Sequence, residues 1–374
     1  MTFAWFGLSG GARGPTLPGL AARVGESLAE IGLVTFASAF GSMIGTLLAG
    51  RLLDRGHGRA MVAVAAVGAV VPLALIPSVR SLPVLLILFA LLGVAGGFIG
   101  TGGQTLLVWT DERRASTRIS AMHFFFGAGA VIGPLTVAWS FPLRGDGLAV
   151  YWAFAAMAIP LAWMLWRAGS GVSVPQHAIP SETRSASRRS FLWFGALFFL
   201  FVGAERIISS WLFAHAMEIG VFDASQAAYL NSGFWTAFTM ARLVSIPLSR
   251  TVSPRRFVGL SVAACAVSSL ALFIVGSTFT GLWVVTIVFG ASIATIFPQT
   301  ASWLNDAIGT TGRRMSWIIL ASSVGSMLFP WGTGLLMERF SGIGLPLALT
   351  AACLAGVVGY VVLVRRMRGA EYPA

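Results

Sequence analysis

The stretch from Phe191 to Ala216 reads FLWFGALFFLFVGAERIISSWLFAHA, and two charged residues interrupt a mostly apolar run. About 20 consecutive apolar residues are enough to cross the hydrocarbon core of a bilayer as a helix. Glu205 and Arg206 therefore fall near the middle of a predicted membrane span. A charge at that depth costs roughly 2.5–3.5 kcal/mol on insertion scales, so it usually faces a partner or a watery cavity. We expect this pair to lie at the functional site.

The composition of the whole chain is that of a membrane protein. Of its 374 residues, 56% are hydrophobic and only 10% are charged, and the mean hydropathy is +0.83. The apolar runs are continuous and rich in Gly, Ala, Leu and Val, so they indicate helices and not alternating strands. The two cysteines, Cys265 and Cys353, lie inside such runs, and we expect packed thiols with neither a disulfide nor a metal site. No cofactor is expected.

Twelve spans can be traced along the chain. They cover residues 2–20, 28–52, 60–78, 82–109, 116–141, 148–167, 190–217, 225–249, 257–276, 280–304, 314–337 and 343–364. The polar segment 168–189 is the one long loop, and it separates an N-terminal six-helix bundle (1–167) from a C-terminal six-helix bundle (190–374). The predicted fold class is an all-α membrane protein with twelve transmembrane helices in two pseudo-symmetric bundles, the first helix being short or truncated.

The charges predict an orientation in the membrane. All 25 basic residues are arginines, and the formal net charge is +12. They are not clustered on one soluble face, so nucleic-acid binding is not expected. With the N-terminus in the cytoplasm, most loop arginines fall on the cytoplasmic side, and Arg23, Arg80, Arg144 and Arg339 fall outside. Because basic residues favour cytoplasmic loops, both termini are predicted to lie in the cytoplasm, beneath the plasma (inner) membrane.

The two predicted bundles share short sequence repeats at a nearly constant offset. The matching pairs are Gln104-Thr105 with Gln299-Thr300, Gly129 and Pro134 with Gly325 and Pro330, and Gly11-Ala12 with Gly203-Ala204. Internal repeats of this kind are typical of transporters that alternate access about a site between their halves.

The loop after the second span reads GRLLDRGHGR from Gly50 to Arg59. It resembles the signature G-x-x-x-D-R-x-G-x-R of the major facilitator superfamily, and it departs from that signature at His57, where the family has glycine. The resemblance implies a cytoplasmic gate in which helix-end charges pair with acids. The residues of this gate are Asp54, Arg55 and Arg59, with Asp111 and Glu112 as the acids. A loop that only sets orientation is the alternative.

Longer strings resemble one branch of that superfamily. They are GGQTLLVW at 102–109, MHFFFG at 122–127, VGAE at 202–205, FW at 234–235 and ARL at 241–243. They look like the sodium-dependent glucose transporter branch, which is similar to the fucose permease type of sugar symporter. The resemblance implies that the first, fourth, seventh and tenth helices line a central cavity. Gly100 stands where fucose permease carries an acidic residue in its fourth helix.

Glycines mark several predicted helix contacts. Gly127, Gly129 and Gly133 with Pro134 look like the family's fifth-helix motif, which is often associated with antiporters but also occurs in symporters. Small residues four apart let helix backbones approach closely. We expect the two other glycine pairs, Gly41-x-x-x-Gly45 and Gly93-x-x-x-Gly97, to serve packing alone.

The predicted site combines polar, aromatic and charged side chains of several spans. Amide and hydroxyl groups suit sugar hydroxyls, and tryptophan faces suit a sugar ring. The predicted substrate-binding residues are Thr101, Gln104, Glu205, Trp211, Asn231, Trp235 and Gln299. The predicted ion-coupling residues are Glu205, Arg206, Arg13 and His123.

The repeat offset matches Arg13 to Glu205, and we expect these two residues to face each other across the cavity. Desolvation favours a protonated carboxyl, so Glu205 can carry a proton, and it can also coordinate Na⁺. A static ion pair with an arginine is the alternative. Arg242 is expected either to bind an anionic group or to lock a helix, and His215 to be solvated.

The sequence therefore predicts a monomeric secondary active transporter that moves a small polar solute, most simply a sugar, coupled to H⁺ or Na⁺. Its expected partners are that small-molecule substrate, the coupling ion and the lipid bilayer. The alternative is a proton-antiport exporter of drugs or metabolites. The chain is not expected to be an enzyme, because it shows no acid paired with a nucleophile, no metal cluster and no phosphate loop. A receptor is a further alternative, and unlike a transporter it would show no substrate-dependent flux.

Overall fold

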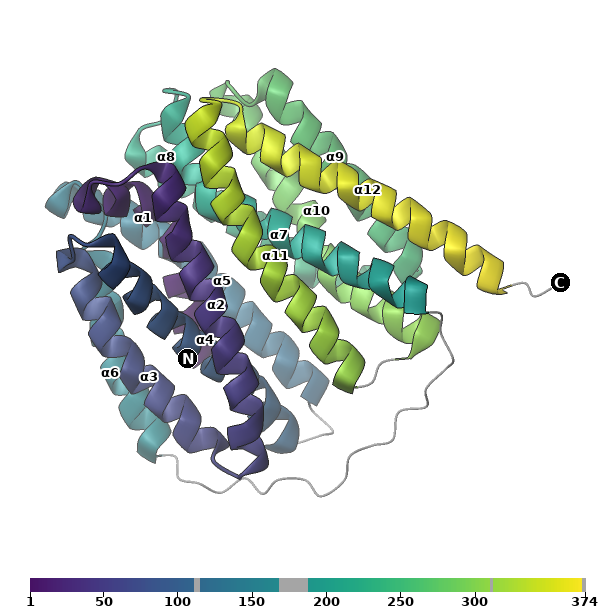
Figure 1. The fold of residues 1–374 in the computed structure, drawn as a ribbon, viewed down its shortest axis with the longest axis horizontal. Helices are drawn as coiled ribbons and strands as arrows, with labels where there is room; N and C mark the ends of the chain where they lie inside the picture. The colour runs from purple at the N-terminus through teal and green to yellow at the C-terminus, as the bar shows by residue number, and fades with distance from the viewer. Residues whose placement is uncertain (111–114, 168–187, 310–311, 372–374) are drawn as a thin grey trace.

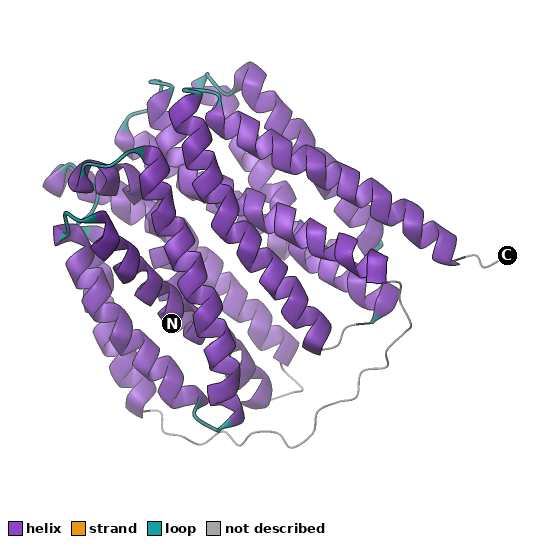
Figure 2. Ribbon diagram, viewed as in Figure 1, coloured by secondary structure: helices purple, strands orange, loops and turns teal. Residues whose placement is uncertain are grey.

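The computed structural model describes residues 1–110, 115–167, 188–309 and 312–371, and all regular structure in these ranges is helical (Figure 1, Figure 2). The twelve α-helices are α1 (Thr2–Val24), α2 (Leu28–Asp54), α3 (Gly58–Leu75), α4 (Leu82–Thr110), α5 (Ala115–Arg144), α6 (Val150–Arg167), α7 (Arg188–Glu218), α8 (Ala224–Leu248), α9 (Pro254–Val275), α10 (Phe279–Ile308), α11 (Gly312–Arg339) and α12 (Gly344–Glu371). A 3-10 turn, Ile76–Ser78, follows α3.

The helices match the twelve predicted spans, with boundaries that differ by a few residues. Among the described residues, nine helices are long and apolar enough to cross a membrane. The first helix extends beyond its predicted end at residue 20, to Val24, and has 23 residues. At ~1.5 Å per residue it is about 34 Å long, which exceeds the ~30 Å hydrocarbon core.

Glycines bring α2 and α4 into backbone contact. A Cβ atom at Gly41 would overlap the carbonyl group of Ala90, and one at Gly93 would overlap that of Ser38. Gly45 and Gly97 continue the same contact one turn further along. The packing role predicted for these four glycines is therefore confirmed.

The glycine motif of α5 also has a packing role. Gly129 lies against the backbone of Ala4, and Gly133 lies against that of Leu8, so α5 packs closely on α1. Gly127 instead faces α8, where a Cβ atom would lie 2.5 Å from the hydroxyl oxygen of Thr239. The motif thus joins α1, α5 and α8, and its glycines are accounted for by helix contacts.

The helices α2, α4 and α6 end at one side of the molecule, which we call the Asp54 end because α2 ends there at Asp54. The turn between α1 and α2 lies at the opposite side, which we call the Gly25 end. Gly25 ends α1 with a φ of 77°, and Ser27 caps α2 by accepting a hydrogen bond from the backbone N–H of Glu30. Arg23 forms an ion pair of 2.8 Å with Asp146, which ties α1 to the α5–α6 connection at the same end.

The two halves meet through α2 with α11, α5 with α8, and α1 with α7. Near the Gly25 end a Cβ atom at Gly334 would lie 2.9 Å from the carbonyl oxygen of Leu28, and one at Gly32 would lie 3.4 Å from the Cα of Trp331. Figure 1 shows α2 and α11 converging toward this end. The halves are therefore in close contact on the Gly25 side.

Candidate functional site

A cavity of about 130 Å³ lies between the two halves. One water needs roughly 10–15 Å³ in this measure, so the cavity has room for a small organic solute or several waters. Six helices, α1, α2, α4, α5, α7 and α11, contribute to its wall. The cavity thus includes the first, fourth and seventh helices, as the family resemblance implies, whereas α10 is not among its lining helices.

Arg13 projects from α1 at this cavity. Its guanidinium carbon lies 5.7 Å from the ring centre of Phe89, and its buried Nε has no hydrogen-bond partner among the described residues. The position of α1 is fixed by the glycine contacts with α5 and by Gly14, where a Cβ atom would overlap the carbonyl oxygen of Ser209 on α7. Arg13 is therefore held beside the junction of the two halves.

Arg206 reaches the same cavity from α7 and repels Arg13 electrostatically. Among the described residues, the cavity lining includes these two arginines and no acidic residue. Each arginine at bilayer depth costs roughly 2.5–3.5 kcal/mol on insertion scales, and an unpaired arginine has no ion pair to offset that cost. The cavity is therefore a site of positive potential.

Hydroxyl groups form much of the remaining polar wall. The lining hydroxyl residues are Thr35, Ser38, Ser42, Ser209, Ser210, Ser323 and Ser326. Several donate their proton to a carbonyl of their own helix, as Thr35 does to Gly32 at 2.7 Å and Ser326 does to Ser323 at 2.8 Å. Their oxygens keep free lone pairs, so they can accept hydrogen bonds from a solute. Sequence interpretation missed this set, although Thr35, Ser38 and Ser42 have the spacing of one helix face.

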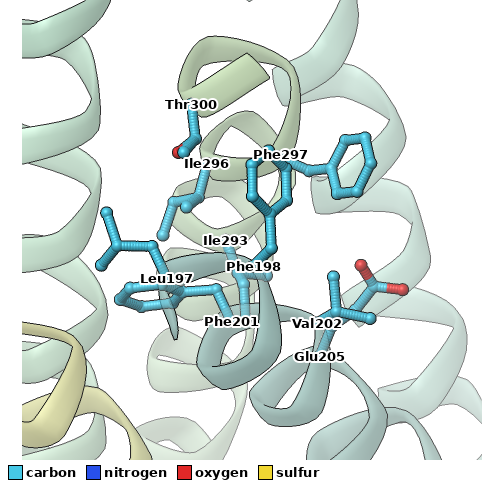
Figure 3. Close-up of a pocket in the computed structure, with 9 residues that line it drawn as sticks. All are labelled: Leu197, Phe198, Phe201, Val202, Glu205, Ile293, Ile296, Phe297 and Thr300. Atoms are coloured by element: carbon cyan, nitrogen blue, oxygen red, sulfur yellow. The ribbon is translucent and has the colours of Figure 1, made fainter. Parts of the chain in front are cut away.

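Glu205 lies in a separate, smaller pocket between α7 and α10, whose volume is about 10 Å³. The pocket is lined by Leu197, Phe198, Phe201, Val202, Glu205, Ile293, Ile296, Phe297 and Thr300. In Figure 3 the carboxylate of Glu205 lies at one side of this group and Leu197 lies at the other. The hydroxyl oxygen of Thr300 is buried without a hydrogen-bond partner among the described residues. The pocket has space for about one water or a small ion, but not for a sugar.

Arg242 on α8 is electrostatically attracted by Glu205 and repelled by Arg206. Its Nε donates a hydrogen bond of 3.2 Å to the carbonyl of Ala294 on α10, and its guanidinium carbon lies 4.3 Å from the ring centre of Phe238. Glu205 forms no ion pair with a described residue. Arg242 thus acts on Glu205 through the field between them and not through direct contact.

The expected arrangement of Arg13 opposite Glu205 is not what the structure shows. Arg206 shares the cavity with Arg13, and Glu205 lines the other pocket. Successive residues of a helix point about 100° apart, so neighbours in sequence can reach different cavities.

The predicted aromatic residues lie between helices. Trp211 is fully buried, and its Nε1 donates a hydrogen bond of 2.7 Å to the carbonyl of Pro330. Trp235 is 2% exposed and packs its ring against Phe126, with ring centres 6.3 Å apart. Neither tryptophan lines the cavity, whereas Phe126 does, together with Phe6 at 5.6 Å between ring centres.

The predicted polar residues are more dispersed. Asn231 is fully buried, and neither its amide nitrogen nor its oxygen has a hydrogen-bond partner among described residues. Thr101 donates a hydrogen bond of 3.4 Å to the hydroxyl of Thr46, and Gln104 is exposed. Gln299 is 7% exposed, beside Thr300 in sequence. None of these residues lines the cavity.

Two histidines differ in their surroundings. His123 is exposed on α5 and interacts electrostatically with Arg242. His215 was expected to be solvated, but it is only 2% exposed, and its Nδ1 lacks a partner among the described residues. Its position one turn before the end of α7 places it inside the packed Gly25 end, which a count of residues from the helix terminus does not reveal.

The predicted gate is only partly described. Asp54 is the last residue of α2, Arg55 follows it, and both are exposed. Asp111, Glu112 and the side chain of Arg59 lie outside the described residues, so the expected pairing stays a prediction.

Residues 2–330 match the Major Facilitator Superfamily. The chain belongs to this family. It is 26% identical to sodium-dependent glucose transporter 1A of Mus musculus, over 96% of this chain and 93% of that protein. It is 25% identical to sodium-dependent glucose transporter 1 of Homo sapiens, over 96% of this chain and 76% of the relative. The predicted family and branch resemblance are therefore confirmed.

The fold is shared with a solved family structure. The crystal structure of the nucleoside transporter NupG superposes with a TM-score of 0.74 at 16% identity, over 99% of this chain and 97% of the other. The likeness confirms the twelve-helix fold. The chain is thus an integral, multi-pass membrane transporter for a small solute.

Proposed function

We propose that this facilitator family member is a secondary active transporter that moves a small polar solute, most simply a sugar, in symport with H⁺ or Na⁺. The observation that carries the proposal is the cavity between the halves, with polar groups from α1, α2, α7 and α11. The names of the relatives support a sugar and sodium. Because α1–α6 and α7–α12 meet at this cavity, rocking of one bundle (1–167) against the other (190–374) would change which end is open.

Glu205 is the proposed ion-coupling residue. Its pocket has room for about one water or a small cation. Carboxylate oxygens are suitable ligands for a hard cation, and carboxyl groups also serve as proton relays in transporters.

The orientation follows from the arginine distribution. The Asp54 end carries Arg51 and Arg55 and joins α6, which ends at Arg167, to α7, which begins at Arg188. By the positive-inside rule we infer that this end faces the cytoplasm, so both termini lie there. Residence in the plasma (inner) membrane and a monomeric state stay predictions.

The test is uptake into proteoliposomes that contain the purified full chain. A panel of radiolabelled sugars is supplied under an imposed Na⁺ or H⁺ gradient. The proposal predicts accumulation above the external concentration with one of these gradients, and Glu205→Gln should abolish accumulation while keeping solute exchange. Glu218→Gln on the same helix is the matched control, because a glutamine oxygen can still accept the hydrogen bond from the backbone N–H of Gly342.

Full gradient-driven accumulation in Glu205→Gln would assign Glu205 to a static role. Expulsion of a lipophilic cation, with no sugar movement, would support an exporter instead. Absence of any substrate-dependent flux would favour a receptor.

A further inference from the structure

The two arginines of the central cavity bear on the charge of the solute. Arg13 and Arg206 line one cavity from opposite halves, and no acidic residue of the described part of the chain joins them in its wall. Glu205 faces the separate pocket between α7 and α10 and forms no ion pair with a described residue. The positive charge of the cavity is therefore not neutralised from within its own lining.

The polar groups of the cavity wall fall into hydrogen-bond donors and hydrogen-bond acceptors. The two guanidinium groups offer donors only, and the Nε of Arg13 is buried without a partner among the described residues. The hydroxyls of Thr35 and Ser326 give their protons to helix carbonyls and offer acceptors. A solute that satisfies both sets carries oxygen acceptors for the arginines, among which anionic oxygens bind most strongly, and O–H groups for the hydroxyl oxygens.

Apolar contact is available on one side of the cavity. Phe6 and Phe126 both line it, and their rings are tilted by 54° with centres 5.6 Å apart. Such rings can pack against the C–H face of a pyranose. The cavity therefore combines two guanidinium groups, hydroxyl acceptors and an aromatic wall.

We propose that the solute is a hydroxylated organic anion, a sugar carrying a carboxylate or phosphate group, whose negative charge binds between Arg13 and Arg206. This inference rests on the proposed transport function and specifies the substrate class of the same cavity. The two arginines come from opposite halves, so the anion would bridge the halves and relieve the repulsion between the guanidinium groups. A neutral sugar would leave that repulsion in place.

Binding to purified full-length protein in detergent tests the proposal by isothermal titration calorimetry. The probes are D-glucose, D-glucuronate, which carries a carboxylate on the same ring, and glucose 6-phosphate. We expect at least one anion to bind about tenfold or more tightly than glucose, because charge-assisted hydrogen bonds exceed neutral ones in strength. Glucuronate alone would indicate a carboxylate site, glucose 6-phosphate alone a phosphate site, and both a general anion site.

Substitutions of Arg13 and Arg206 test whether these residues cause the preference for an anion over glucose. Arg13→Gln and Arg206→Gln should each weaken anion binding by about tenfold or more and change glucose binding little. Arg206→Lys should keep a preference for the anion, because the charge remains, and this guards against a merely misfolded glutamine variant. Arg23→Gln is the control, since Arg23 pairs with Asp146 outside the cavity.

Equal or tighter binding of glucose, no binding of either anion, or anion binding unaffected by both glutamine substitutions would overturn the inference. These outcomes are separate from failure of the proposed function. Gradient-driven accumulation of glucose without anion preference would leave transport standing and remove the anionic solute. Absence of flux for every solute of the uptake panel, these three included, would remove the transport function itself.

Discussion

At the scale of single residues, a rotation of one position decides the chemistry of α7. Arg206 enters the cavity between the halves, and Glu205 enters the pocket beside α10. The sequence indicates that both charges are important, because a buried charge needs a polar environment. It does not indicate their directions, because the lipid-facing and protein-facing sides of a membrane helix are both apolar. The sequence offset that matched Arg13 to Glu205 is therefore an insufficient guide to facing residues.

Gly14 tests the contact between α1 and α7. A Cβ atom there would overlap the carbonyl oxygen of Ser209, whereas Gly10, one turn earlier, has open space at its Cβ position. Gly14→Ala should destabilise the described state by about 1–3 kcal/mol through overpacking, and Gly10→Ala should not. Thermal unfolding of the two variants in detergent measures the difference. Equal melting temperatures would show that the α1–α7 contact is not as close as described.

At the scale of helices, the sequence predicts well which segments are helical and roughly where each helix begins and ends. Runs of apolar residues must form helices in a bilayer, since every backbone polar group has to be satisfied internally. Glycines four apart also predicted the α2–α4 contact correctly. The roles of tryptophans were less predictable. The ring of Trp211 is suited both to packing between helices and to contact with a sugar, so its sequence position does not decide between these roles. Its hydrogen bond to the carbonyl of Pro330 shows the packing role.

The α2–α4 contact yields a prediction for Gly41. Gly41→Ala places a methyl group against the carbonyl of Ala90, so it should lower the free energy of unfolding by about 1–3 kcal/mol. Gly68→Ala on α3 is the control, because nothing lies near its Cβ position, and alanine there favours the helix. Thermal unfolding in detergent compares the melting temperatures of the two variants. A Gly41→Ala variant as stable as Gly68→Ala would contradict close backbone packing.

At the scale of the whole molecule, two bundles meet around a cavity and pack tightly at the Gly25 end. The repeats in the sequence predict such a two-part design. They cannot predict which end is closed, because the same residues must pack in more than one arrangement during a transport cycle. The hydroxyl-lined wall also depends on how α2 and α11 approach each other, which no local pattern encodes.

We propose that solute crosses through the cavity when the contact at the Gly25 end opens. Gly32→Cys with Trp331→Cys places two thiols at that contact, where a Cβ atom on Gly32 would lie 3.4 Å from the Cα of Trp331. This is near enough for a disulfide between α2 and α11. Cys265 and Cys353, which are buried free thiols, are replaced first so that only the new pair can react.

The decisive measurement is gradient-driven solute uptake by proteoliposomes containing this protein, before oxidation, after oxidation and after reduction. We expect accumulation in the reduced protein, loss of about nine-tenths or more of it on oxidation, and recovery with a reductant, because a covalent S–S bond keeps α2 and α11 from separating. Unchanged uptake in fully oxidised protein would contradict the claim that the Gly25 end opens during transport.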